Sequence, residues 1–167
     1  VRNINLVIDP TTYGTSTVGT ATTYRTTYAM KFSGSPGTFT VDETITQTNS
    51  DSLVATGKVI EYDATLQILY YQHEKFSGYG TLSSTGGLNL FSGTGTVTGG
   101  TSSATGTPDS SADSAVSLAG GNTITFTNGY ANPELQPDSG NIIYRENRKP
   151  ISRATDQTED IKIIVEF

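Results

Sequence analysis

The chain has 167 residues, a net charge of −6 and an isoelectric point near 4.6. This length is enough for one ordinary hydrophobic core, and the acidic balance argues against sequence-independent nucleic-acid binding. No apolar run approaches the roughly 18 residues that cross a bilayer, and the chain has no cysteine. We therefore expect no nucleic-acid partner, no membrane partner, no disulfide framework and no cysteine nucleophile. Abundant glycine, threonine and serine favour strands joined by turns.

The first predicted element is a strand over residues 4–8, which ends at the turn-forming pair Asp9 and Pro10. Because the chain opens at Val1 within this pattern, we expect a fragment or a processed product. Residues 11–23 are almost entirely Thr, Ser and Gly, which predicts a surface loop. The alternation over residues 24–32 predicts a second strand whose aromatic side chains, beginning with Tyr24, face inward.

Residues 34–121 are interpreted as one inserted β module, and residues 1–33 plus 122–167 as the core layer that it interrupts. The module opens with a Gly/Pro turn and continues with short strand-like runs. A weaker copy of its first half follows downstream, which we interpret as a pseudo-repeat. The matching positions are Phe39 with Phe91, Ile45 with Val97, and Ala55-Thr56-Gly57 with Ala104-Thr105-Gly106. Residues 99–121 have few large apolar side chains, so we expect an exposed, mobile loop there.

Candidate catalytic groups are few. His73 is the single histidine, and no nucleophile or orienting partner stands at a fixed spacing from it, so we expect an exposed residue at a strand end. Asp42 and Glu43 are adjacent, and neighbours in a strand point to opposite faces, so their carboxylates do not converge. The acidic run over residues 109–113 lacks the spacing of an EF-hand loop. We predict no enzyme activity, no cofactor and no bound metal.

The C-terminal stretch, residues 139–167, contains half of the chain's basic residues and two strand-like runs. The first run covers residues 141–144. The second covers residues 161–167 and places apolar side chains at every other position, as a half-buried strand does. Between them Pro150 lacks a backbone donor and breaks any helix. The basic residues are interspersed with carboxylates, which is typical of a solvated connection.

The same stretch contains a specific pattern. It reads Tyr-x-Glu-Asn-Arg-x-Pro-Ile over residues 144–151, then Asp-Gln-Thr-Glu over residues 156–159, and it ends in an aromatic residue. This pattern resembles the C-terminal end of a baseplate wedge protein of T-even-type contractile-tailed bacteriophages. The resemblance implies that the chain is a cyanophage-like variant of that protein with a β insertion. The strand over residues 2–10 is similar to a strand upstream of that motif in the same family, with Asp9 in place of Asn.

The resemblance implies a structural virion protein: a subunit of the tail baseplate wedge that acts through protein–protein contacts and assembles in the host cytoplasm. The implied partners are other baseplate wedge proteins, with a second copy of the chain as a further candidate. The pattern supplies no catalytic, cofactor-binding or metal-binding residues. The residues that it singles out either hold the terminal fold together or contact partners: Tyr144, Glu146, Asn147, Arg148, Pro150, Asp156, Gln157 and Glu159. The alternative is a receptor- or glycan-binding β module on the virion surface.

We predict an all-β fold: a small β-sandwich or barrel-like core with an inserted β module, long Ser/Thr/Gly-rich loops and little or no helix. The strand ending at Asp9 and Pro10 and the run over residues 161–167 are expected to lie in one sheet or packed layer. Residues 34–121 are expected to protrude from that layer.

Overall fold

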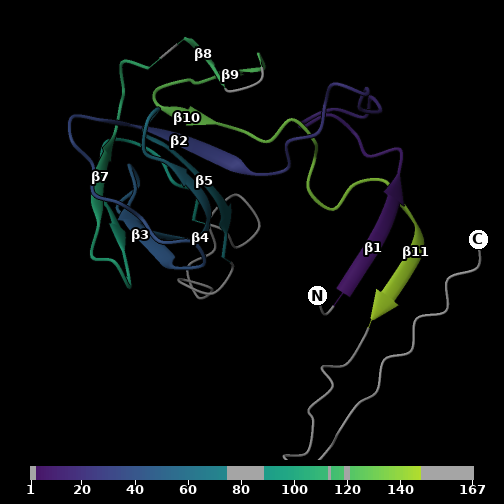
Figure 1. Ribbon diagram of the computed structural model, residues 1–167, viewed down its shortest axis with the longest axis horizontal. Coiled ribbons are helices and arrows are strands. Elements are labelled where there is room, and N and C mark those ends of the chain that lie inside the picture. The colour runs from purple at the N-terminus through teal and green to yellow at the C-terminus, as the bar shows by residue number, and fades with distance from the viewer. Residues whose placement is uncertain (1–2, 75–88, 113, 119–120, 148–167) are drawn as a thin grey trace, which may run out of the picture.

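The computed structural model describes residues 3–74, 89–112, 114–118 and 121–147 (Figure 1). Within these ranges the chain forms eleven strands and no helix, which confirms the predicted all-β fold. The strands are β1 (Asn3–Ile8), β2 (Tyr28–Ser33), β3 (Thr44–Thr48), β4 (Val54–Asp63), β5 (Ile68–His73), β6 (Val97–Gly99), β7 (Thr105–Pro108), β8 (Ala115–Ser117), β9 (Thr123–Thr125), β10 (Tyr130–Ala131) and β11 (Asn141–Asn147).

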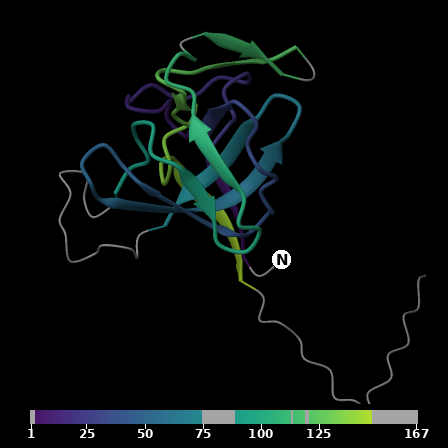
Figure 2. The same cartoon turned by 90° about the vertical axis from the view of Figure 1, so that its left-hand side faces the viewer.

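Six of these strands close into a barrel. The hydrogen-bonded order is β10-β2-β5-β4-β3-β6-β7, and β2 also pairs with β7, so the sheet closes on itself with β10 as an extra strand (Figures 1 and 2). β10 and β7 pair with the same edge of β2 at different positions along it. β10 pairs with Ala29 and Met30, whereas β7 pairs with Phe32 and Ser33. Closure removes the long open edges that a flat sheet of this size would expose.

The barrel is filled by the inward-facing side chains of alternating strand residues. In β3, for example, Ile45 and Gln47 are buried, whereas Thr46 and Thr48 between and beyond them are exposed. The buried residues of this core are Met30, Phe32, Phe39, Ile45, Ala55, Val59, Leu69, Tyr71, Phe91, Val97 and Ala104.

The two copies of the pseudo-repeat take equivalent places in the barrel. The first contributes β3 and β4, the second contributes β6 and β7, and β3 pairs directly with β6. A Cβ atom added to Gly57 would lie 3.0 Å from the ring of Phe91, and one added to Gly106 would lie 2.8 Å from the ring of Phe32. Glycine therefore ends the Ala-Thr-Gly motif in both copies because an inward aromatic ring occupies the space of a side chain.

The prediction of an exposed loop over residues 99–121 is wrong. This stretch contains β7, which closes the barrel against β2, and β8. Along β7 and just before it, Ala104, Gly106 and Pro108 alternate inward and are buried. Small residues remove little area from water themselves, but they let the backbone approach a large ring such as that of Phe32. Composition alone therefore underestimates what this segment buries.

A second, smaller apolar cluster joins the β8–β9 hairpin and β10 to the barrel strands β2 and β5. Its buried members are Ala29, Ile68, Ala112, Ile124, Phe126 and Ala131. The chain enters β10 through a tight turn at Asn128 and Gly129, which have φ angles of 51° and 83°. Thr127 and Tyr130 exchange backbone hydrogen bonds of 2.8 and 3.0 Å across it. Asparagine and glycine tolerate the left-handed backbone that such a two-residue turn requires.

Strand β2 begins at Tyr28, later than predicted, because the preceding residues bond to the connection between β10 and β11. Arg25 Nη2 donates to the carbonyl oxygen of Asn132 at 2.7 Å. Glu134 Oε2 accepts hydrogen bonds from the backbone N–H groups of Tyr24 and Arg25, each at 3.1 Å. The side chain of Tyr24 is left exposed, so the prediction that it faces inward is wrong.

Strands β1 and β11 form a separate antiparallel ribbon beside the barrel (Figure 1). β2 lies within residues 1–33, which we assigned to the core layer. It pairs with the barrel strands β5 and β7 and not with this ribbon. The division into residues 34–121 and the two flanking segments as structural units stays a prediction. So does the sheet expected between the Asp9–Pro10 strand and residues 161–167, because residues 148–167 lie outside the described ranges.

Candidate assembly surface

The register of β1 against β11 assigns side chains to the two faces of the ribbon. Leu6 lies opposite Tyr144, and Ile4 lies opposite Glu146. Opposite residues of an antiparallel pair share a face, and alternate residues of one strand do too, so Ile8 joins them. We call this set, Ile4, Leu6, Ile8, Tyr144 and Glu146, the outer face.

The outer face is largely apolar and nevertheless exposed. Leu6 and Tyr144 are each 54% exposed, and Ile4 is 49% exposed. Among the described residues, more than half of the exposed large apolar side chains belong to β1 or β11. Single exposed apolar side chains are common on protein surfaces, but a contiguous group of them marks a surface that binds another molecule or segment.

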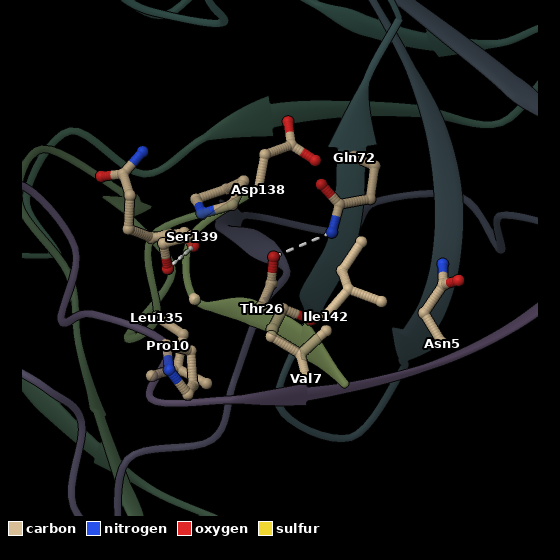
Figure 3. A pocket seen from close by; sticks show the side chains of 12 residues that line it. Asn5, Val7, Pro10, Thr26, Gln72, Leu135, Asp138, Ser139 and Ile142 are labelled. Atoms are coloured by element: carbon tan, nitrogen blue, oxygen red, sulfur yellow. Dashed lines mark hydrogen bonds between the residues drawn. The ribbon is translucent and has the colours of Figure 1, made fainter. Parts of the chain in front are cut away.

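The opposite face of the ribbon borders a cleft of about 670 Å³ between the ribbon and the barrel (Figure 3). Asn5, Val7 and Ile142 line it from the ribbon, and Thr26 and Gln72 line it from the barrel side. Gln72 Nε2 donates to the carbonyl oxygen of Thr26 at 2.8 Å, which fixes that wall. We call this side of the ribbon the cleft face.

The base of the ribbon is held by hydrogen bonds between the segments that flank it. The backbone N–H of Thr11 donates to Ser139 Oγ at 2.9 Å, and this hydroxyl donates to the carbonyl oxygen of Gln136 at 2.7 Å. Gly140 has a φ angle of 86°, and a Cβ atom there would lie 2.7 Å from the carbonyl oxygen of Ile8. Glycine therefore permits the close approach of the two chains at the point where the ribbon begins.

Three of the residues singled out by the terminal motif lie on β11. Tyr144 and Glu146 share the outer face, and Asn147 ends the strand. The other five fall outside the described residues: Arg148, Pro150, Asp156, Gln157 and Glu159. The structure thus brings Tyr144 and Glu146 together on one surface.

Sequence reasoning identified β1 as a strand but missed its part in this surface. The available signal is the continuous apolar run from Leu6 to Ile8, which predicts a strand covered on both faces rather than on one. The described part of the chain covers neither face of β1 fully, since Leu6, Val7 and Ile8 are all exposed.

The two groups considered for catalysis are engaged in the fold. His73 is partly buried, with its ring centroid 4.6 Å from that of Tyr28, so the prediction of an exposed histidine is wrong. Two of the rings that pack against it, those of Tyr28 and Phe91, come from other segments of the chain. Burial lowers the pKa of His73 from 6.5 to about 4, because a buried imidazolium loses its hydration.

Glu43 is almost fully buried and accepts several hydrogen bonds. Its Oε1 accepts from the backbone N–H of Thr40 and from Ser102 Oγ, each at 2.7 Å, and its Oε2 accepts from the backbone N–H of Ser102 at 2.8 Å. Burial alone would raise the pKa of Glu43, but these hydrogen bonds together lower it below 4.5. Asp42 is exposed and lies in a turn with a φ angle of 65°, so its carboxylate diverges from that of Glu43 without the strand alternation on which the prediction rested.

Across residues 3–74, 89–112, 114–118 and 121–147, no group of three or more His, Asp or Glu side chains could hold a metal ion. No helix long and apolar enough to cross a bilayer occurs in that part of the chain.

Residues 114–167 match the family Phage-Gp8, described as Bacteriophage T4, Gp8. The C-terminal third of the chain is a Gp8-like segment. It starts at the β8–β9 hairpin and includes β10 and β11. The match confirms the predicted resemblance to a baseplate wedge protein, and it supports a structural role in a phage baseplate and a location in the virion tail.

Nothing in this match favours the receptor- or glycan-binding alternative, and the cyanophage-like detail stays a prediction. Comparison with curated proteins found no significant match, and comparison with solved structures found none either.

Proposed function

We propose that the chain is a structural, non-enzymatic subunit of a phage baseplate wedge and that it binds other wedge proteins through the outer face of the β1–β11 ribbon. The observation that carries this proposal is that Ile4, Leu6, Ile8 and Tyr144 form a contiguous apolar group, each about half exposed. Full burial of such a side chain stabilises by about 1.5–3 kcal/mol, so each half-exposed one can still contribute roughly 1 kcal/mol to binding.

The position of the ribbon supports this role. The ribbon lies beside the barrel and is attached through its base and the connection over residues 132–140 (Figure 1). A partner can therefore contact the outer face without disturbing the barrel core. Tyr144 lies centrally on that face, opposite Leu6, and tyrosine is enriched at interfaces because it combines an apolar ring with a polar end.

A role without catalysis is supported by the way the candidate groups are used. Both carboxylate oxygens of Glu43 accept hydrogen bonds from neighbouring loops, so this group stabilises the barrel. The imidazole of His73 packs among the rings of Tyr28, Tyr71 and Phe91. We place assembly in the host cytoplasm, as the resemblance implies.

The test is co-expression of the chain with the other wedge proteins of the same phage, followed by sedimentation. Leu6→Ser removes an apolar side chain from the outer face, and Ile60→Ser is the matched control because Ile60 is 43% exposed on the barrel strand β4. We expect Leu6→Ser to weaken co-assembly about fivefold, which corresponds to roughly 1 kcal/mol, and Ile60→Ser to leave it unchanged. Absence of co-assembly for the unmodified chain, or equal effects of the two variants, would contradict the proposal.

A further inference from the structure

A small polar pocket lies between the β8–β9 hairpin and the segment that precedes β2. Its volume is about 230 Å³, and neither β1 nor β11 contributes to it. The β8–β9 hairpin lies at the opposite end of the molecule from the free end of the ribbon (Figures 1 and 2). Pockets of about 300–1,000 Å³ hold drug-sized molecules, so this one has room for a single small ring. The lining residues are Thr22, Tyr24, Arg25, Leu118, Asn122, Thr123 and Glu134.

Hydrogen bonds between distant segments fix the walls of this pocket. The backbone N–H of Glu134 donates to the carbonyl oxygen of Arg25 at 2.8 Å. On the hairpin side, the backbone N–H of Leu118 donates to the carbonyl oxygen of Asn122, also at 2.8 Å. Asn122 Nδ2 donates to Tyr24 Oη at 2.7 Å and so joins the two walls. A pocket whose walls are already ordered costs less to fill than one that the ligand has to order.

Tyr24 supplies a flat apolar surface at this pocket. Its side chain is 56% exposed, although its backbone N–H and its hydroxyl are both held by hydrogen bonds. The hydroxyl accepts the hydrogen bond from Asn122, so its own proton remains free to donate to a ligand. A tyrosine ring that is held in place and exposed offers a large contact area at low entropic cost.

The charges that line the pocket balance each other. The guanidinium of Arg25 donates to the carbonyl oxygens of Thr27 and Asn132. Burial lowers the pKa of Arg25, and the nearby carboxylate of Glu134 opposes that shift. Within the described residues Glu134 Oε1 accepts no hydrogen bond, because both backbone donors bind Oε2. An anion would be repelled by Glu134 and a cation by Arg25, so the pocket favours a neutral ligand that donates and accepts hydrogen bonds.

A sugar ring meets all of these requirements. One face of the ring consists of C–H groups that can stack on an aromatic side chain, and each hydroxyl both donates and accepts. We propose that this pocket binds one monosaccharide unit of a glycan, with the sugar ring stacked on Tyr24 and a sugar hydroxyl donating to Glu134 Oε1. The family match, residues 114–167, includes Asn122 and Glu134 but not Tyr24, so the site is assembled from both parts of the chain.

The test is a titration of the full-length chain followed by NMR of its backbone amides. The probes are methyl α-D-glucopyranoside, methyl β-D-galactopyranoside and N-acetyl-D-glucosamine, with glycerol as a polyol that has no ring. We expect at least one sugar to shift the signals of Tyr24, Asn122 and Thr123 with saturation in the low-millimolar range, since so small a ligand makes few contacts. We expect glycerol to cause no saturable shift.

Two alanine variants separate stacking from a general surface effect. Tyr24→Ala removes the ring, and Val41→Ala is the matched control because Val41 is 55% exposed and lies outside the pocket. We expect Tyr24→Ala to weaken sugar binding at least about fivefold, Tyr24→Phe to weaken it less because the ring remains, and Val41→Ala to leave it unchanged.

Three outcomes would overturn the proposal: no saturable shift with any of the three sugars, equal effects of Tyr24→Ala and Val41→Ala, or saturable binding of acetate or N-acetyl-lysine amide in place of the sugars. Because β1 and β11 take no part in the pocket, sugar binding and co-assembly with wedge proteins succeed or fail separately.

Discussion

His73 gives the sharpest test of the barrel core. It is the single histidine of the chain and packs among three aromatic rings, with centroid distances of 4.6 Å to Tyr28, 5.3 Å to Tyr71 and 5.4 Å to Phe91. Its Nδ1 atom is buried, and within the described residues it has no hydrogen-bond partner. Substitution of His73 by Phe replaces the titratable ring with one that fits the same aromatic surroundings.

The expected size of the effect follows from the pKa of His73, which burial lowers from 6.5 to about 4. Between these two values the unfolded chain binds a proton that the folded chain does not, so the free energy of unfolding falls as the pH falls from 6.5 towards 4. This group then costs about 2 kcal/mol of stability between pH 7 and pH 5, and about 3 kcal/mol once both states are protonated.

The assay is urea unfolding of the natural chain and of His73→Phe at pH 7, 6 and 5. The carboxylates are common to both proteins and cancel in the difference, so the advantage of the variant should grow by about 2 kcal/mol between pH 7 and pH 5. His73→Gln serves as a control that removes titration without adding apolar surface. An identical pH dependence in all three proteins, or a directly measured pKa of His73 near 6.5, would refute the reasoning.

Three further substitutions test the barrel, each by the change in the free energy of unfolding. Glu43→Gln should destabilise by about 2 kcal/mol at pH 7 through loss of charge-assisted hydrogen bonds. Because the pKa of Glu43 is lowered, this difference should be present above pH 4.5 and disappear as the pH falls through the folded-state pKa. Gln47→Leu should cost about 2–4 kcal/mol, because the buried amide of Gln47 donates to Gly95 O at 2.7 Å and to Tyr130 Oη at 2.9 Å. Gly57→Ala should cost about 1–3 kcal/mol, since its Cβ atom would meet backbone and ring atoms at 2.7 and 3.0 Å; no loss would contradict the packing described.

Features with local signals could be predicted from the sequence. The alternation in β1, β3 and β9 identifies strands, because the side-chain period of a strand is two residues. The turn at Asn128 and Gly129 was predictable because both residues tolerate the left-handed backbone that a two-residue hairpin turn requires. The pseudo-repeat and the terminal motif are likewise visible as residue patterns.

Features that depend on distant residues could not be predicted. Closure of the barrel needs β7 to meet β2 at Phe32, more than seventy residues away in the sequence, and β7 consists of small or hydroxyl-bearing residues and proline. The burial of His73 depends on the rings of Tyr28 and Phe91, which belong to other segments. The exposure of the ribbon could not be predicted either. The apolar run in β1 predicts burial, but within the described residues no layer covers it.

The Gp8-like segment is joined to the barrel at several points, although the barrel lies outside the family match. Tyr130 in β10 donates from its hydroxyl to the carbonyl oxygen of Gly93 at 2.8 Å and accepts from Gln47. Ile124 and Phe126 bury their side chains against barrel residues such as Ile68. The segment that carries the family pattern thus depends on residues 34–121 for part of its own core, since removal of the barrel would expose Ile124 and Phe126 to water. The ribbon follows the same segment in the chain, since residues 132–140 connect β10 to β11.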